Sequence, residues 1–163
     1  MNVMKKTNAM RILENKGIDY EIIEYSPKGG ISGVEVAATL KEDENLVFKT
    51  LVTQSKDDHY VFVVPVAREL DLKKAAASSK EKKIEMIPQR ELLGLTGYVH
   101  GGCSPVGMKK QFKTFIDLSA KDLNYFYISG GKIGMQIKIS PLDLKSLIDA
   151  EFYDLVKDDL DEL

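Results

Sequence analysis

The sequence has few of the residues that build cross-linked or metal-dependent folds. Its 163 residues include one cysteine, Cys103, so no disulfide can form within the chain. A single thiol fits a reducing compartment. The two histidines, His59 and His100, lie far apart, and Cys103 is close in sequence only to His100. We therefore expect no metal site, because structural metal sites need a cluster of such ligands.

Long apolar runs and nucleotide-binding motifs are also missing. The strongly apolar stretches are short, such as residues 60–66, and none approaches the roughly 20 residues that a membrane span requires. No signal-peptide pattern follows Met1. The triplet at residues 130–132 lacks the spaced glycine and the Ser or Thr of a phosphate-binding loop, so a hairpin turn explains it better. These absences predict a soluble, cytoplasmic protein.

The net charge is −2, but the charges are unevenly distributed. Residues 73–113 contain nine basic and three acidic residues, whereas residues 142–163 contain eight acidic and two basic ones. A local excess of basic residues permits binding of an anionic partner on one face. A solvated surface with an acidic tail explains the same pattern equally well, so charge alone leaves both interpretations open.

Helix start and stop signals recur along the chain. Thr7 suits the N-cap of a helix that ends near Gly17, and Ser32 with Glu35 forms a capping-box pattern ahead of a second helix. Asp71 suits the N-cap of a third helix. Further helical segments are predicted over residues 88–93, 140–148 and 150–156.

Strand signals are more numerous and mostly form hairpins. Residues 46–53 and 60–66 flank a polar turn, and residues 125–129 and 133–139 flank a Gly-Gly pair. Additional strands are predicted over residues 20–25, 83–86 and 113–117. This irregular mixture, in a chain that is 44% hydrophobic and 29% charged, predicts one α+β domain with a largely antiparallel sheet, which we assign to residues 1–163.

Two segments carry candidate chemistry. Lys49 lies in a β-rich stretch and shares a strand face with Val47 and Leu51. Such a lysine either extends its ammonium to solvent at a sheet edge or lines a pocket. The loop over residues 97–107 has four glycines, and its backbone N–H groups can approach an anion or an oxyanion. A merely tight turn is the alternative for this loop.

Cys103 stands in the same loop, three residues after His100. This spacing raises the alternative of a thiolate nucleophile with a neighbouring base. A free cysteine is more often a small buried hydrophobic residue, and we favour that interpretation.

Taken together, these segments resemble the YbaK/EbsC family of aminoacyl-tRNA deacylases. The order and spacing of the shared motifs match along nearly the whole chain, although each motif alone is weak. The motifs are Phe-Lys-Thr (residues 48–50), Leu-Lys-Lys-Ala-Ala (72–76), Thr-Gly-Tyr (96–98), Gly-Gly-x-Ser-Pro-x-Gly (101–107) and Ser-Gly-Gly (129–131).

The resemblance implies a β-barrel-like mixed sheet surrounded by helices, a fold also used by editing domains of some prolyl-tRNA synthetases. It implies hydrolytic release of cysteine from mischarged Cys-tRNA(Pro), with Cys-tRNA(Cys) as a further substrate, without metal or cofactor. The implied partners are aminoacyl-tRNA and prolyl-tRNA synthetase, and neither a membrane nor DNA. The implied catalytic residues are Lys49 and Gly101, and the implied substrate-binding residues are Tyr25, Thr50, Gly102, Ser129, Gly130 and Gln136.

In the cysteine-specific subgroup, the thiol of the substrate is thought to attack its own ester. Lys49 would then anchor the terminal ribose or phosphate, or favour the thiolate. Many members have Asp where this chain has Gln136, which bears on amino-acid preference. Two alternatives stay open: a deacylase for alanine or serine esters that uses an activated water, and a non-catalytic module that binds tRNA or a partner.

Overall fold

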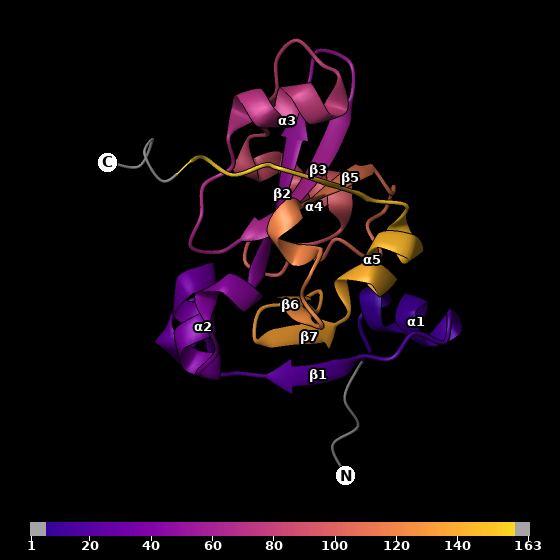
Figure 1. Ribbon diagram of the computed structural model, residues 1–163. Coiled ribbons are helices and arrows are strands. Elements are labelled where there is room, and N and C mark those ends of the chain that lie inside the picture. Colours follow the sequence, from indigo (N-terminus) through magenta and orange to yellow (C-terminus); the bar gives the residue numbers. More distant parts are fainter. Residues whose placement is uncertain (1–5, 159–163) are drawn as a thin grey trace.

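Two open β-sheets with helices packed around them form the chain (Figure 1). The computed structural model describes residues 6–158. Short 3-10 helices are η1 (Pro27–Gly29), η2 (Glu44–Leu46), η3 (Gln89–Glu91) and η4 (Leu118–Ala120). The other elements are α1 (Asn8–Asn15), β1 (Glu21–Glu24), α2 (Gly33–Leu40), β2 (Phe48–Gln54), β3 (His59–Pro65), α3 (Leu72–Ser79), β4 (Glu85–Met86), α4 (Leu92–Thr96), β5 (Lys113–Asp117), β6 (Phe126–Ser129), β7 (Met135–Ile139), α5 (Pro141–Ile148) and β8 (Glu151–Tyr153).

The larger sheet has the strand order β4-β2-β3-β5-β8. Its centre is the predicted hairpin of β2 and β3, which is confirmed with a continuous register from Phe48 opposite Pro65 to Gln54 opposite His59. β3 pairs in parallel with β5, and β5 in parallel with β8. Residues 61–66 are buried throughout, as expected for a central strand that is covered on both faces.

The smaller sheet has the order β1-β7-β6, and both of its pairings are antiparallel. The predicted hairpin of β6 and β7 is confirmed, and it places Ser129 directly opposite Gln136. Its connection includes Gly131 and Gly134 with φ of 104° and 92°. Residues with a side chain rarely adopt these values, which explains why glycine occupies both positions.

The α+β class is confirmed, and most strand pairs are antiparallel, but the expected barrel-like closure is wrong. A closed barrel needs the outer strands of one sheet to pair with each other. Here β4 and β8 are the outer strands of one sheet, and β1 and β6 are those of the other. Among the described residues, a backbone bridge between Val47 and Tyr127 links the two sheets. Phe48 and Phe126 pack edge to face beside that bridge, with ring centroids 4.9 Å apart.

Three predicted helix starts are confirmed by their capping hydrogen bonds. The hydroxyl of Thr7 accepts from the N–H of Met10, and the carboxylate of Asp71 accepts from the first turn of α3. Ser32 and Glu35 form a reciprocal capping box at the start of α2. Side-chain caps of this kind stabilise a helix by about 0.5–2 kcal/mol, so local sequence is enough to specify these starts.

The helical turn predicted over residues 150–156 is wrong, because part of this segment forms β8. Asp149 adopts φ of 52°, which ends α5. The following residues then pair with the free edge of β5, with Phe152 opposite Ile116. The carboxylate of Asp117 also accepts a hydrogen bond from the N–H of Leu155 at 3.0 Å. A distant strand edge, invisible in the local sequence, decides the conformation of this segment.

Basic residues of segment 73–113 form ion pairs with acidic residues of the C-terminal segment. The ammonium of Lys74 lies 3.1 Å from Asp154 and 3.0 Å from Asp158, and it donates to the carbonyl of Val156 at 2.7 Å. Lys113 and Glu151 form a similar pair across β5 and β8 at 3.4 Å. Part of the basic excess therefore holds the C-terminal segment instead of facing an external anion.

Residues 6–158 contain no helix that is both long and apolar enough to cross a membrane. The predicted domain, residues 1–163, includes residues 1–5 and 159–163, which lie outside the described residues.

The close packing of α2 on the larger sheet predicts an effect of Gly33→Ala. A Cβ at Gly33 would lie 2.3 Å from Cγ1 and 2.5 Å from Cβ of Val66, so α2 would have to move. We expect a loss of about 1–3 kcal/mol in the free energy of unfolding, measured by denaturant titration. Gly94→Ala in α4 is the matched control, because nothing lies within 4 Å of its Cβ position. That change should be neutral or stabilising, and equal losses in the two variants would contradict the packing argument.

Candidate functional site

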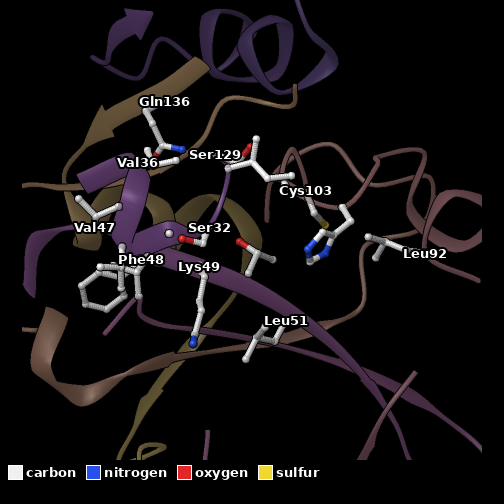
Figure 2. A pocket seen from close by; sticks show the side chains of 17 residues that line it. Ser32, Val36, Val47, Phe48, Lys49, Leu51, Leu92, Cys103, Ser129 and Gln136 are labelled. Carbon is white, nitrogen blue, oxygen red and sulfur yellow. The ribbon is translucent and has the colours of Figure 1, made fainter. Parts of the chain in front are cut away.

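A pocket of about 410 Å³ lies where α2, β2, the glycine-rich loop and the smaller sheet approach one another (Figure 2). Its walls are mostly apolar, with polar groups from each contributing segment. The lining residues are Ile31, Ser32, Gly33, Val34, Val36, Val47, Phe48, Lys49, Thr50, Leu51, Val66, Leu92, His100, Gly101, Cys103, Ser129 and Gln136.

The pocket borders a part of β2 that lacks a strand partner on one side. β4 pairs with β2 only at Thr53 and Gln54, and the bridge from Val47 to Tyr127 engages the chain just before β2. Between these points, residues 48–51 line the pocket. Successive side chains of a strand point to opposite faces, so this run includes side chains from both faces. Both faces can border one cavity only at an edge of the strand.

Lys49 extends from β2 into this pocket, which answers the question that the sequence left open. The side chain is half-buried, and its residue pairs with Val64 of β3. Burial lowers the pKa of its ammonium below the usual value, while the charge of Glu69 acts in the opposite direction. Within the described residues, no carboxylate lies within 4.0 Å of its Nζ. The pocket thus contains a cation without a direct ion pair.

Two polar atoms of the pocket wall are buried without a hydrogen-bond partner among the described residues. They are Oγ1 of Thr50 and Oε1 of Gln136. Ser129, opposite Gln136 in the sheet, uses its Oγ to accept from the N–H of Gly131 at 3.2 Å. An unsatisfied buried polar atom costs about 1–3 kcal/mol, so each such atom in a pocket is a candidate ligand contact.

The glycine-rich loop supplies backbone donors at another wall. Gly101 adopts φ of 87°, a conformation that favours glycine. The N–H of Gly102 donates to the carbonyl of Val99 at 3.0 Å. Among the described residues, the N–H groups of Gly101 and Cys103 form no backbone hydrogen bond. Both residues line the pocket, so their N–H groups are candidate donors to an anionic group.

No activated protein nucleophile is evident among the described residues that line the pocket. Cys103 is buried, as the sequence favoured, and burial raises the pKa of its thiol to about 12. His100 is exposed and forms no hydrogen bond to this thiol. The hydroxyls of Ser32 and Ser129 accept backbone hydrogen bonds, and neither is bonded to a base. Residues 6–158 also contain no group of three or more His, Cys, Asp or Glu residues placed to hold a metal.

The structure brings together five of the eight residues that the resemblance implied for the site. Two lie on β2, one in the glycine-rich loop and two on the β6–β7 hairpin. They are Lys49, Thr50, Gly101, Ser129 and Gln136. Their chemical roles stay predictions, since the placement alone does not test them.

The other three implied residues lie beside the pocket without lining it. Tyr25 continues β1 by donating its N–H to the carbonyl of Gly134 at 2.9 Å, and its hydroxyl is buried without a partner among the described residues. A Cβ at Gly102 would lie 2.9 Å from the backbone of Lys132, so this glycine allows close packing of two loops. The carbonyl of Gly130 accepts from the hydroxyl of Thr7 at 2.6 Å, which ties the hairpin to α1.

The wall formed by α2 and the residues before it was not among the site residues predicted from the sequence. Ile31, Ser32 and Val36 line the pocket from this side. The capping box predicted the helix but not its position. Gly33 at the first turn carries the signal, because its packing against Val66 requires the absence of a side chain.

Comparison with solved structures shows that this fold is shared. A protein described as "a putative trans-editing enzyme for prolyl tRNA synthetase" superposes with a TM-score of 0.84 over 93% of this chain and 96% of its own, at 23% identity. At that level of identity the likeness defines the fold alone: two open sheets with helices packed around them.

Sequence comparison then identifies the family. The profile of the aminoacyl-tRNA editing domain matches residues 31–147, and the chain belongs to this family, which confirms the YbaK/EbsC resemblance. A relative from Enterococcus faecalis, named "Putative Cys-tRNA(Pro)/Cys-tRNA(Cys) deacylase EbsC", is 41% identical over 93% of both chains. A proline–tRNA ligase of Kosmotoga olearia is 30% identical over 74% of this chain, which matches 21% of that protein.

The environment of Cys103 predicts an unreactive thiol. With a pKa of about 12, the thiolate fraction at pH 8 is roughly three orders of magnitude below that of a free cysteine. We expect a disulfide reagent at pH 8 to label Cys103 about a thousandfold more slowly in the folded protein than in the unfolded protein. In denaturant, the labelling rate should equal that of a free cysteine. Rapid labelling of the folded protein would restore Cys103 as a candidate nucleophile.

Proposed function

We propose that this chain is a deacylase that releases cysteine from Cys-tRNA(Pro), with Cys-tRNA(Cys) as a second substrate. The printed name of the 41% identical relative supports this substrate class. The observation that carries the proposal is the composition of the pocket: an unpaired ammonium and free backbone donors, without an activated nucleophile among the described lining residues. Such a site suits a substrate that brings its own nucleophile.

Cysteine esters carry that nucleophile in the thiol of the side chain. The thiolate attacks the carbonyl carbon of its own ester, a cyclic thioester forms, and the bond to the terminal ribose oxygen breaks. The departing ribose oxygen takes up the proton that the thiol released, and water later opens the thioester to give free cysteine. A thiol with a pKa of about 8.5 is partly ionised at neutral pH, and intramolecular attack has a large proximity advantage.

The residues of the pocket would stabilise the negative charges of this reaction, on the attacking thiolate and on the carbonyl oxygen. The ammonium of Lys49 favours an anion nearby, either the thiolate or the 3′-terminal nucleotide. The N–H groups of Gly101 and Cys103 would donate to the oxyanion that forms on the carbonyl oxygen. Within the described lining residues there is no carboxylate to oppose either effect.

The proposal predicts fast release of cysteine, but not of alanine or serine, from esters of tRNA(Pro). Lys49→Ala should lower the rate at least about 100-fold, as loss of a transition-state donor does, with folding checked by circular dichroism. Lys121→Ala is the control, because this exposed lysine lies away from the pocket. Release of alanine or serine instead would indicate an activated water. Failure to release any of the three would favour a binding module, and full activity of Lys49→Ala would contradict its role.

We further propose that prolyl-tRNA synthetase is the partner that supplies the tRNA, in the cytoplasm. The net charge of −2 and the internal pairing of Lys74 and Lys113 favour weak unaided binding of a polyanion. The matched proline–tRNA ligase and the trans-editing neighbour support this choice of partner.

Addition of the synthetase should raise the rate on full-length Cys-tRNA(Pro) at low enzyme concentration. It should leave the rate unchanged on a cysteine ester of a short oligonucleotide that ends in CCA, which the synthetase does not present. Steady-state rates on the two substrates measure this, and equal stimulation of both would contradict the partnership.

A further inference from the structure

The two ends of the pocket differ in polarity. Figure 2 shows Gln136 and Ser129 at one end and the ammonium of Lys49 at the other. Gln136 is only 6% exposed, and its carbonyl oxygen Oε1 has no hydrogen-bond partner among the described residues. One end therefore contains a buried neutral acceptor without a partner, whereas the opposite end contains a cation without a direct ion pair.

The antiparallel pairing of β6 and β7 fixes the position of this acceptor. Gln136 stands opposite Ser129 on β6 and opposite Ile23 on β1, so its strand is held on both sides. The Oγ of Ser129 already accepts from the N–H of Gly131. Of the two groups at this end, Oε1 of Gln136 is the acceptor left without a donor.

An aminoacyl ester has the complementary polarity. Its α-amino group can be protonated to an ammonium near neutral pH, as the α-amino groups of ordinary chains are, while its nucleotide end carries phosphates. Placing the α-ammonium beside Lys49 would set two like charges together. Placing it beside Gln136 gives it an acceptor and leaves Lys49 for the nucleotide.

We propose that Oε1 of Gln136 accepts a hydrogen bond from the α-ammonium of the substrate, so that the pocket selects esters of free amino acids over N-acylated ones. This inference rests on the proposed deacylase function. An N-acyl group removes the positive charge and leaves a single neutral amide N–H, so it offers Oε1 a weaker donor. Gln136 is thus a specificity-determining residue that distinguishes aminoacyl from peptidyl or other N-blocked esters.

The test compares Cys-tRNA(Pro) with N-acetyl-Cys-tRNA(Pro) in steady-state kinetics. The unmodified enzyme should prefer the free-amine ester. Gln136→Leu should raise KM for this ester by about 10- to 100-fold, the range for a hydrogen bond to a charged group. The N-acetyl ester should be almost unaffected, so the preference disappears. Thr53→Val is the control, because Thr53 is buried outside the pocket and its hydroxyl donates to the carbonyl of Tyr60.

A second variant covers the case in which Gln136→Leu does not fold. Gln136→Glu keeps the shape and introduces a carboxylate, so the preference should persist at neutral pH and weaken as the pH falls and this group is protonated. A preference independent of pH in this variant, or one retained by folded Gln136→Leu, would overturn the inference. Equal rates on both esters by the unmodified enzyme would overturn the inference alone. Absence of any cysteine release would instead refute the proposed function.

Discussion

A strand edge that loses its partner partway along its length creates the pocket of this protein. On this edge, β2 pairs with β4 only at Thr53 and Gln54. Val47, just before β2, contacts the smaller sheet through its bridge to Tyr127. Between these two points, one side of the strand borders a cavity, while the other side stays paired with β3. A strand that continued the pairing along residues 48–51 would fill the pocket.

This geometry also sets the electrostatics of the site. Lys49 is half-buried on the segment of β2 that has β3 on one side and no strand on the other, and no carboxylate lies among the described residues that line the pocket. Lys74, in contrast, is paired with Asp154 and Asp158. The unused acceptor of Gln136 comes from the other sheet. Leaving such groups without partners costs stability, and a bound ester that satisfies both would recover that cost.

Local sequence predicted the elements whose causes are local. Thr7, Ser32 and Asp71 start helices because their side chains reach N–H groups only a few residues away. Both hairpins were predicted because each turn directly joins the strands that pair. The strand β8 was missed because its partner, the edge of β5, lies more than thirty residues earlier. Barrel closure was wrong for a similar reason, since it depends on pairings between distant strands.

The sequence by itself determined that a lysine would stand in an apolar strand, that a loop rich in glycine would offer backbone donors, and which ordered motifs relate the chain to an editing family. Only the tertiary structure decided that Lys49 and Gly101 line one cavity and that α2 forms one of its walls. It also decided that Gly102 and Gly130 do not line the cavity but pack against neighbouring segments. The physical reason is range. Caps and turns depend on neighbours within a few residues, whereas a cavity depends on which distant surfaces pack and which strand edge they leave open.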